Sequence, residues 1–381
     1  MSYKRDFNIP KTSFFLLGPR GSGKTTMLKN LNFASHTIDL LDSQNFRRLS
    51  ANPHLLYEEL SSLKANSFVI IDEIQKIPEL LNEVHRLIEN KKIKFALTGS
   101  SARKLKSVSA NLLGGRAALK YMYPLTPHEM GADFNLNQAL ELGTLPLIIK
   151  SDDPEETLKS YVDLYLKEEI QAEALVRNLS GFIRFLPIAA LMHGQKINLS
   201  SIARDSEVQR ATVQGFFSIL EDTLLVRRLE AYQAKIRVRE QQKAKFYFID
   251  PGIVRSCKNI KGEVAAEEKG SLFEGLIFTL LTIQKEMHQD IDSLHYWSPA
   301  EAKNTEVDFL ISKGKGKIAV EVKSGTQVST ADLKGLKAIT ELKSVKRKII
   351  VYNGNTSRTT AEGIEIMPFK TFINELAKKN I

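Results

Sequence analysis

The sequence predicts an α/β protein of several domains, with a parallel β-sheet in its first part and a second, smaller α/β domain at its end. Over residues 1–150, apolar strand-like runs alternate with helical segments, which is typical of a parallel sheet with crossover helices. A helical stretch and a helix, turn, helix, hairpin pattern follow, and from residue 270 a helix precedes a new series of strands. At 381 residues the chain is long enough for two or three domains.

The first part begins with an apolar strand at 13–17 that leads into a glycine-rich loop and then into a helix at 24–32. The loop has the pattern G-x-x-x-x-G-K-[ST] and consists of Gly18, Pro19, Arg20, Gly21, Ser22, Gly23, Lys24 and Thr25, with Thr26 next in the helix. Glycines let backbone N–H groups surround phosphates, Lys24 reaches the β- and γ-phosphates, and Thr25 can hold Mg²⁺. The sequence therefore predicts a site for ATP, or another nucleoside triphosphate, with Mg²⁺.

Two further strands bring polar residues to the same site. The strand at 68–72 ends in Asp72, and Glu73 follows it. In a P-loop ATPase the first acid would position the water shell of Mg²⁺, and the second would polarise the attacking water. The strand at 94–98 is followed by Ser100 and Ser101, either of which could sense the γ-phosphate. The alternative is that these serines form only a turn.

Composition limits the possible classes of protein. No run of 18 apolar residues is present, and the N-terminus lacks the apolar core of a signal peptide, so we expect a soluble, cytoplasmic protein with no membrane partner. The formal net charge of +10 falls mainly on residues 1–150 and permits contact with DNA, although a solvated lysine surface gives the same composition. The single cysteine, Cys257, excludes an internal disulfide framework and is expected to be a packing residue.

Residues 151–180 are expected to form a helical lid or linker, because 154–176 are strongly helical. Residues 181–255 are expected to form a winged helix, with helices at 182–193, 199–205 and 211–220 before strands at 223–232 and 244–249. The strands and their connection carry the basic residues Arg227, Arg228, Lys235, Arg237, Arg239, Lys243 and Lys245. They would suit a wing that contacts DNA. The alternative is a winged helix used for packing or protein contact, with a solvated basic hairpin.

Residues 262–381 are expected to form the last domain, with a helix at 271–287, strands at 294–298, 305–311, 318–323 and 347–352, and a helix at 330–341. Asp308 lies on the second strand, while Glu321 and Lys323 share one face of the third, because strand side chains alternate. Such carboxylates suit Mg²⁺ or Mn²⁺, and a lysine beside a metal-bound water lowers the pKa of that water. Glu274 could complete the metal site from the preceding helix. The alternative is a charged pairing inside an inert domain.

This set of acids and lysine resembles the PD-(D/E)xK nuclease superfamily, with Val307 in place of the proline. The chain as a whole resembles prokaryotic AAA-type ATPases that carry a C-terminal DUF4143 region. The segments that carry this second resemblance are 18–25, 70–76, 97–103, 111–116, 246–252 and 306–323. It implies an AAA+ P-loop ATPase core over 1–150 and a restriction-endonuclease-like α/β domain over 262–381.

The resemblance also implies roles for particular residues. Glu73 would be catalytic in ATP hydrolysis, with Asp72 and Ser100 or Ser101 beside the nucleotide, and Asp308, Glu321 and Lys323 would be catalytic in a nuclease. A neighbouring subunit would supply Arg116 or Arg103 to the ATP site, so we expect a homo-oligomer.

The sequence therefore favours an ATP-dependent DNA-processing protein, in which an AAA+ ATPase is coupled to a metal-dependent nuclease-like domain. The alternative is a nucleotide-gated module that binds DNA or protein and has an inert nuclease-like domain. A signalling NTPase is a third class that would use the same parts.

Overall fold

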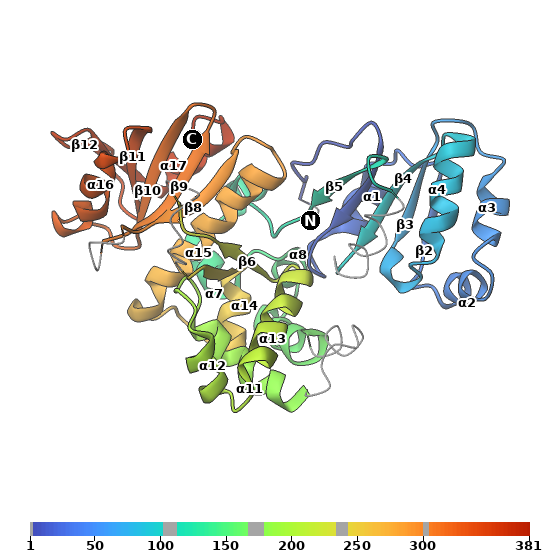
Figure 1. The fold of residues 1–381 in the computed structure, drawn as a ribbon, viewed down its shortest axis with the longest axis horizontal. Coiled ribbons are helices and arrows are strands. Elements are labelled where there is room, and N and C mark those ends of the chain that lie inside the picture. The colour runs from blue at the N-terminus through green and yellow to red at the C-terminus, as the bar shows by residue number, and fades with distance from the viewer. Residues whose placement is uncertain (1–2, 102–112, 167–178, 234–242, 300–304) are drawn as a thin grey trace. The chain divides into compact units, whose positions relative to one another are not determined.

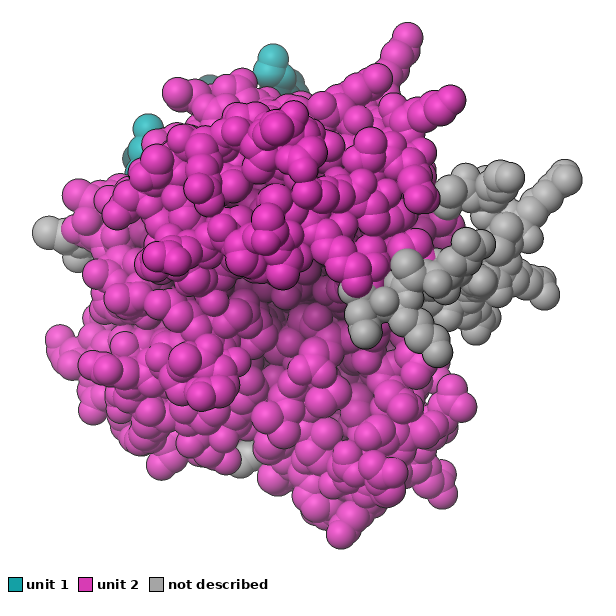
Figure 2. All heavy atoms as spheres, turned by 90° about the vertical axis from the view of Figure 1, so that its left-hand side faces the viewer, with its two compact units in different colours: residues 1–123, 145–147, 220–225 teal, residues 124–144, 148–219, 226–381 magenta. Residues whose placement is uncertain are grey.

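The structure is a computed structural model that describes residues 3–101, 113–166, 179–233, 243–299 and 305–381. The chain divides into two compact units (Figures 1 and 2). Unit 1 comprises residues 1–123, 145–147 and 220–225, and unit 2 comprises 124–144, 148–219 and 226–381. The domain boundaries at 150, 180 and 255 stay predictions.

Unit 1 is built on a five-stranded sheet in the order β2-β3-β4-β1-β5, in which all neighbouring strands are parallel. The strands are β1 (Ser13–Leu17), β2 (His36–Asp39), β3 (Phe68–Asp72), β4 (Lys94–Gly99) and β5 (Ala117–Tyr121). The first four correspond to the strands predicted from apolar runs at 13–17, 36–41, 68–72 and 94–98, whereas β5 was not predicted. The predicted α/β class with a parallel sheet is confirmed for this unit.

Helices cover both faces of this sheet because alternate strand residues enter two different cores. Phe14, Leu16 and Ile70 pack with Met27 and Leu28 of helix α1. The other face, which includes Phe15, Leu17 and Ile71, packs with apolar residues of the remaining helices. The helices of unit 1 are α1 (Lys24–Asn30), α2 (Ser43–Ala51), α3 (Leu55–Leu60) and α4 (Leu80–Lys91), with a 3₁₀ turn at Ile74–Lys76.

The first part of unit 2 is mainly helical. Its predicted helices 182–193, 199–205 and 211–220 correspond to α11 (Leu179–Leu191), α12 (Leu199–Asp205) and α13 (Arg210–Asp222), and the predicted hairpin to the antiparallel strands β6 (Val226–Leu229) and β7 (Lys245–Phe248). The long helix predicted at 154–176 is α9 (Pro154–Ser160) followed by a π-helical turn (Tyr161–Leu166), and its remainder lies outside the described residues. Further helices are α6 (Pro127–Met130), α7 (Leu136–Leu142) and α14 (Pro251–Cys257), with a 3₁₀ turn at Gly131–Asp133. Two helices contain residues of both units, because α8 (Pro146–Ile149) begins in unit 1 and the last residues of α13 belong to unit 1. The assignment as a winged helix stays a prediction.

The last part of unit 2 contains a mixed six-stranded sheet in the order β12-β13-β11-β10-β9-β8. Strand β10 pairs antiparallel with β9 and parallel with β11, so its apolar centre is buried and packs with Leu336 and Ile350. The strands are β8 (Ser293–Trp297), β9 (Val307–Lys313), β10 (Gly316–Lys323), β11 (Val345–Tyr352), β12 (Arg358–Thr359) and β13 (Ile364–Pro368). The helices are α15 (Ala266–Glu286), α16 (Lys334–Ala338) and α17 (Phe369–Ala377), with 3₁₀ turns at Ala331–Leu333 and Ile339–Glu341. Its assignment to the nuclease-like fold stays a prediction.

Within the described ranges, no helix has the length and apolar character needed to cross a membrane.

Candidate functional site

The glycine-rich loop of unit 1 lies between β1 and α1, where the sequence predicted it. Gly18 packs so closely that a Cβ atom there would lie 2.4 Å from the Met122 carbonyl oxygen. Gly23 precedes α1 with φ 87°, a left-handed conformation that glycine adopts without strain. The backbone of this loop therefore depends on glycine at these two positions.

Lys24 and Ser22 are the buried polar side chains of this loop. The Lys24 ammonium is 5% exposed and donates to the carbonyl oxygens of Gly18, at 2.7 Å, and Pro19, at 3.1 Å. The Ser22 hydroxyl is buried and has no hydrogen-bond partner within the described part of the chain. A buried hydroxyl without a partner is costly. The loop thus has a donor and a hydroxyl with which a phosphate could form hydrogen bonds.

Asp72 joins the loop to the strands beside it. Its carboxylate, 2% exposed, accepts hydrogen bonds from Thr25 Oγ1, at 2.7 and 3.0 Å, and from Thr98 Oγ1 on β4. A hydroxyl and a carboxylate next to a phosphate-binding loop are the oxygen ligands that Mg²⁺ prefers. The residues present therefore fit Mg²⁺ and a nucleotide, and Thr25 and Asp72 would hold the ion.

Glu73 is held by hydrogen bonds close to Asp72. Its backbone N–H donates to Thr98 Oγ1 at 3.1 Å, and its carboxylate accepts from Gln75 Nε2 and, at 3.3 Å, from Ser100 Oγ. Glu73 has φ 58°, a conformation that is uncommon outside glycine and often marks a functional site. The structure thus brings both acids together with Ser100, while Ser101, the other sensor candidate, is also buried.

Sequence reasoning missed three residues of this site. Thr98 bonds to both Asp72 and Glu73, and Gln75 Nε2 donates to Ser100 Oγ at 3.0 Å. Thr98 could have been found as a polar residue inside an apolar strand. The Arg5 guanidinium donates to the carbonyl oxygens of Ser22 and Tyr123, at 2.7 Å each. It thereby ties the segment before β1 to the loop, and no sequence motif pointed to it.

The remaining predicted contacts to the nucleotide are Arg20, Thr26 and the arginine supplied in trans. Arg20 and Thr26 are exposed. Arg116, a candidate for the arginine supplied in trans, forms an ion pair with Glu89 of α4. Its hydrogen bond to that carboxyl, together with its charge, keeps the pKa of Glu89 below the ordinary value. Arg103, the other candidate, lies outside the described residues.

The predicted basic wing is only partly a basic surface. Lys235, Arg237 and Arg239 lie outside the described residues. Lys245 is 4% exposed, so the expectation that it contacts DNA is wrong. Arg227 is also largely buried and pairs with Glu286 at 3.2 Å.

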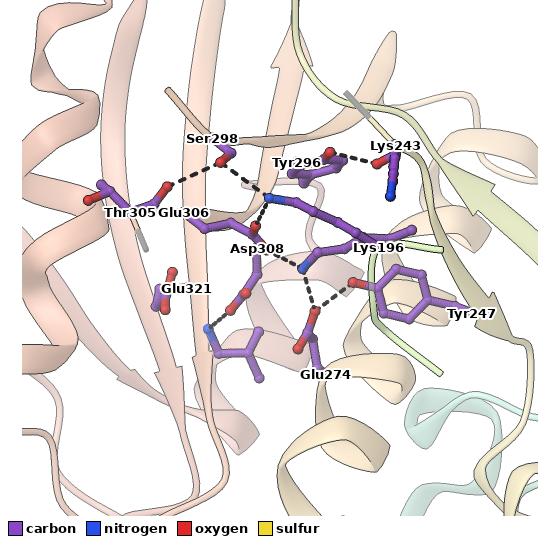
Figure 3. A network of polar contacts seen from close by, with 12 residues as sticks. Lys196, Lys243, Tyr247, Glu274, Tyr296, Ser298, Thr305, Glu306, Asp308 and Glu321 are labelled. Carbon is purple, nitrogen blue, oxygen red and sulfur yellow. Dashed lines mark hydrogen bonds and ion pairs between the residues drawn. The ribbon is translucent and has the colours of Figure 1, made fainter. Parts of the chain in front are cut away.

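Unit 2 contains a cluster of carboxylates and lysines, which we call the carboxylate cluster (Figure 3). Its members are the acids Glu274, Glu306, Asp308 and Glu321 and the lysines Lys196, Lys245 and Lys323. As predicted, Glu321 and Lys323 lie together, with Oε1 and Nζ 2.8 Å apart. Asp308 Oδ2 accepts from the Val322 backbone N–H at 2.8 Å, which brings the strands of the predicted acids together.

The electrostatics of the cluster reflect burial and crowding of negative charge. Burial, together with the charges of Glu274 and Glu321, raises the pKa of Asp308 well above its ordinary value. Burial also raises the pKa of Glu321, and the nearby Lys323 opposes that shift only in part. These two carboxyls therefore retain protons at a higher pH than carboxyls in water.

The predicted metal site at Glu274, Asp308 and Glu321 does not fit the structure. Over the residues described, no three His, Cys, Asp or Glu side chains are arranged to hold a metal ion. One of these three carboxylates, that of Glu274, has its Oε1 3.3 Å from the Lys245 ammonium. Accordingly, neither Mg²⁺ nor Mn²⁺ is assigned here, and no reaction step is derived through a metal in unit 2.

Three family models match successive parts of the chain. Residues 10–131 match the family model of the AAA domain, and residues 269–372 match DUF4143, a domain of unknown function. Residues 133–264, between them, match another domain of unknown function, DUF8612. The resemblance to AAA-type ATPases with a C-terminal DUF4143 region is therefore confirmed.

Two uncharacterized bacterial proteins are similar to most of this chain. An uncharacterized protein of Mycobacterium tuberculosis is 24% identical over 362 residues, which cover 93% of this chain and 79% of that protein. An uncharacterized protein of Haemophilus influenzae is 23% identical over 356 residues, covering 88% of this chain and 84% of that protein.

Solved structures give weaker likenesses. The Orc1 protein of Aeropyrum pernix in complex with DNA covers 66% of this chain and 87% of its own, at 14% identity and a TM-score of 0.25. The likeness to the replication initiator DnaA, bound to AMPPCP and single-stranded DNA, covers 57% of this chain and 84% of the DnaA chain. The identity is 14% and the TM-score is 0.26. These TM-scores are too low for either likeness to carry an argument.

Proposed function

We propose that this protein binds ATP with Mg²⁺ in unit 1, hydrolyses it, and uses its nucleotide state to control binding to DNA. The observation that carries the proposal is the hydrogen-bonded group formed by Thr25, Asp72 and Thr98 beside the glycine-rich loop. The match to the AAA domain supports the same chemistry.

Each residue would have a defined task in hydrolysis. Lys24 would exchange its two loop carbonyls for phosphate oxygens, and Thr25 and Asp72 would hold Mg²⁺ through oxygen atoms. The bound ion would neutralise phosphate charge. Glu73 would orient and deprotonate the attacking water, with Ser100 holding its carboxylate in place.

Substitution of Lys24 and Glu73 separates binding from hydrolysis. Lys24→Ala should abolish ATP binding, whereas Glu73→Gln should leave binding intact and slow turnover by roughly 10²- to 10⁴-fold, because only the general base is lost. The matched control is Glu58→Gln on α3, whose side chain is 62% exposed. Binding is measured with a fluorescent ATP analogue and turnover by phosphate release. Turnover that is unchanged in both variants would overturn the proposal.

The proposal for DNA is supported by the net charge of +10 and its concentration in residues 1–150. Binding of linear, single-stranded and branched DNA is measured by fluorescence anisotropy at several salt concentrations, with ATP or ADP. Replacing Arg237, Arg239 and Lys243 with Ala should flatten the dependence of log binding constant on log salt concentration. The slope should fall by up to about three if all three residues touch phosphates. An affinity for DNA that is the same with ATP and with ADP would contradict the proposal that the nucleotide state controls DNA binding.

For unit 2 we propose that it binds DNA or protein and does not cleave DNA. This is the alternative to the nuclease that the sequence favoured first. This choice is supported by Lys245, whose ammonium pairs with two of the carboxylates. Incubation of the same DNA substrates with Mg²⁺ or Mn²⁺ tests it. Cleavage by the wild type that disappears in Asp308→Ala would restore the nuclease assignment.

We also propose that the protein acts as a homo-oligomer in the cytoplasm, with Arg116 or Arg103 completing a neighbour's ATP site. Light scattering with and without ATP tests the assembly. Arg116→Ala and Arg103→Ala, each mixed with Lys24→Ala subunits, test which arginine acts in trans. A monomer at all nucleotide states would contradict this arrangement.

A further inference from the structure

Lys245 is buried at a position where its charge has to be balanced from within the protein. It lies on β7, with its side chain only 6% exposed. Its ammonium contacts Glu306 Oε1 and lies 3.3 Å from Glu274 Oε1. An ammonium without counter-charges would be very unfavourable at such a site. The two carboxylates, which come from α15 and from the residue before β9, provide those counter-charges.

We propose that Lys245 is the built-in cation of the carboxylate cluster and that it excludes a divalent metal from these carboxylates. The ammonium binds the carboxylate of Glu274 that was predicted as a metal ligand. A metal bound between Glu274 and Asp308 would therefore lie close to the Lys245 ammonium, and the two cations would repel each other strongly in a site with little water.

Hydrogen bonds already use much of the capacity of these carboxylates. Tyr247 donates its hydroxyl to Glu274 Oε1 at 2.5 Å, and Lys196 lies 2.7 Å from Glu306 Oε2. Asp308 Oδ2 accepts from the Val322 N–H. Glu321 Oε2 is buried without a partner among the described residues, but one such oxygen does not form a metal site.

The ion pairs of the cluster also connect separate parts of unit 2. Lys245 connects the β6–β7 hairpin to helix α15 and to the residues that lead into the mixed sheet. Lys196, which follows α11, also reaches Glu306. Ion pairs thus link the helical part of unit 2 to its sheet.

Metal titration of the full chain without nucleotide tests this inference, with Mn²⁺ alone as the probe and calorimetry as the readout. Wild type and Asp308→Asn should give the same heats of Mn²⁺ binding. Neither should show a saturable Mn²⁺ site that the other lacks. Lys245→Met, which keeps the length of the side chain, should gain one Mn²⁺ site. That site should be lost again in Lys245→Met combined with Asp308→Asn.

Lys196→Met is the matched control, because Lys196 also pairs with Glu306 but its side chain is 39% exposed. It should gain no Mn²⁺ site. Saturable Mn²⁺ binding by the wild type that is lost in Asp308→Asn would overturn the inference, even if Lys245→Met does not fold. A folded Lys245→Met protein, judged by circular dichroism, that gains no site would also overturn it. ATP turnover is measured in parallel, so failure of the ATPase proposal would be seen separately.

Discussion

The buried His193 should make unit 2 sensitive to acid, and the substitution His193→Asn tests this directly. His193 is 2% exposed, and its Nδ1 accepts a hydrogen bond from the Phe248 backbone N–H at 3.1 Å. Its ring packs edge-on to Tyr247, with the centroids 5.6 Å apart. Burial, assisted by the charge of Lys258, lowers the pKa of His193 to about 3. Asparagine can keep an acceptor near Nδ1 but cannot take up a proton.

The magnitude follows from the difference between the folded and unfolded pKa values. Because the pKa is lower in the folded protein, the unfolded chain binds the proton first, and stability falls as the pH falls below about 6.5. At about pH 5, which is roughly 1.5 units below the unfolded pKa, protonation of His193 in the unfolded chain lowers the free energy of unfolding. At about 1.4 kcal/mol per pH unit the loss is about 2 kcal/mol. Near pH 7.5 the contribution of this proton is about zero.

Urea denaturation at the two pH values, followed by circular dichroism, measures the effect. His193→Asn should be less stable than the wild type at the higher pH, since the smaller side chain leaves a cavity. The difference between the two proteins should then shrink by about 2 kcal/mol at the lower pH. A difference that is the same at both pH values would refute the reasoning, because His193 would then not titrate on unfolding.

Three further predictions concern packing and hydrogen bonding at single positions. Gly18→Ala should weaken ATP binding at least tenfold, measured with a fluorescent analogue, because its Cβ would lie 2.4 Å from the Met122 carbonyl oxygen. The control Gly215→Ala, whose Cβ would have no atom within 4 Å, should leave ATP binding unchanged. Thr98→Val should lower kcat for ATP about tenfold and change the nucleotide Kd little, because it removes hydrogen bonds to Asp72 and Glu73. Equal losses in kcat and in nucleotide affinity would contradict a role of Thr98 in turnover. Arg255→Met should destabilise unit 2 by about 3–5 kcal/mol in denaturation, because it leaves Glu268 buried without its partner at 3.1 Å, and adding Glu268→Gln should restore part of the loss.

The sequence by itself determined the features that depend on residues close together in the chain. The strand, glycine loop and helix at 13–30 could be predicted because phosphate-binding loops need glycine, lysine and a hydroxyl at fixed spacing. Asp72 and Glu73 were placed correctly at the end of a buried strand, since parallel strands end at one edge of a sheet. The order of helices before the β6–β7 hairpin followed from apolar periodicity.

Only the tertiary structure decided which distant residues share a site. Thr98 lies in an ordinary strand by sequence, and it bonds to Asp72 only because β3 and β4 are neighbours in the sheet. Lys245 looked like one more basic residue of a solvated hairpin. It is buried because the hairpin packs against α15, and Glu274 of α15 and Glu306, just before β9, supply the opposite charge. Burial and charge pairing are set by contacts between segments far apart in sequence, so local residue patterns could not distinguish a metal site from an internal ion-pair network.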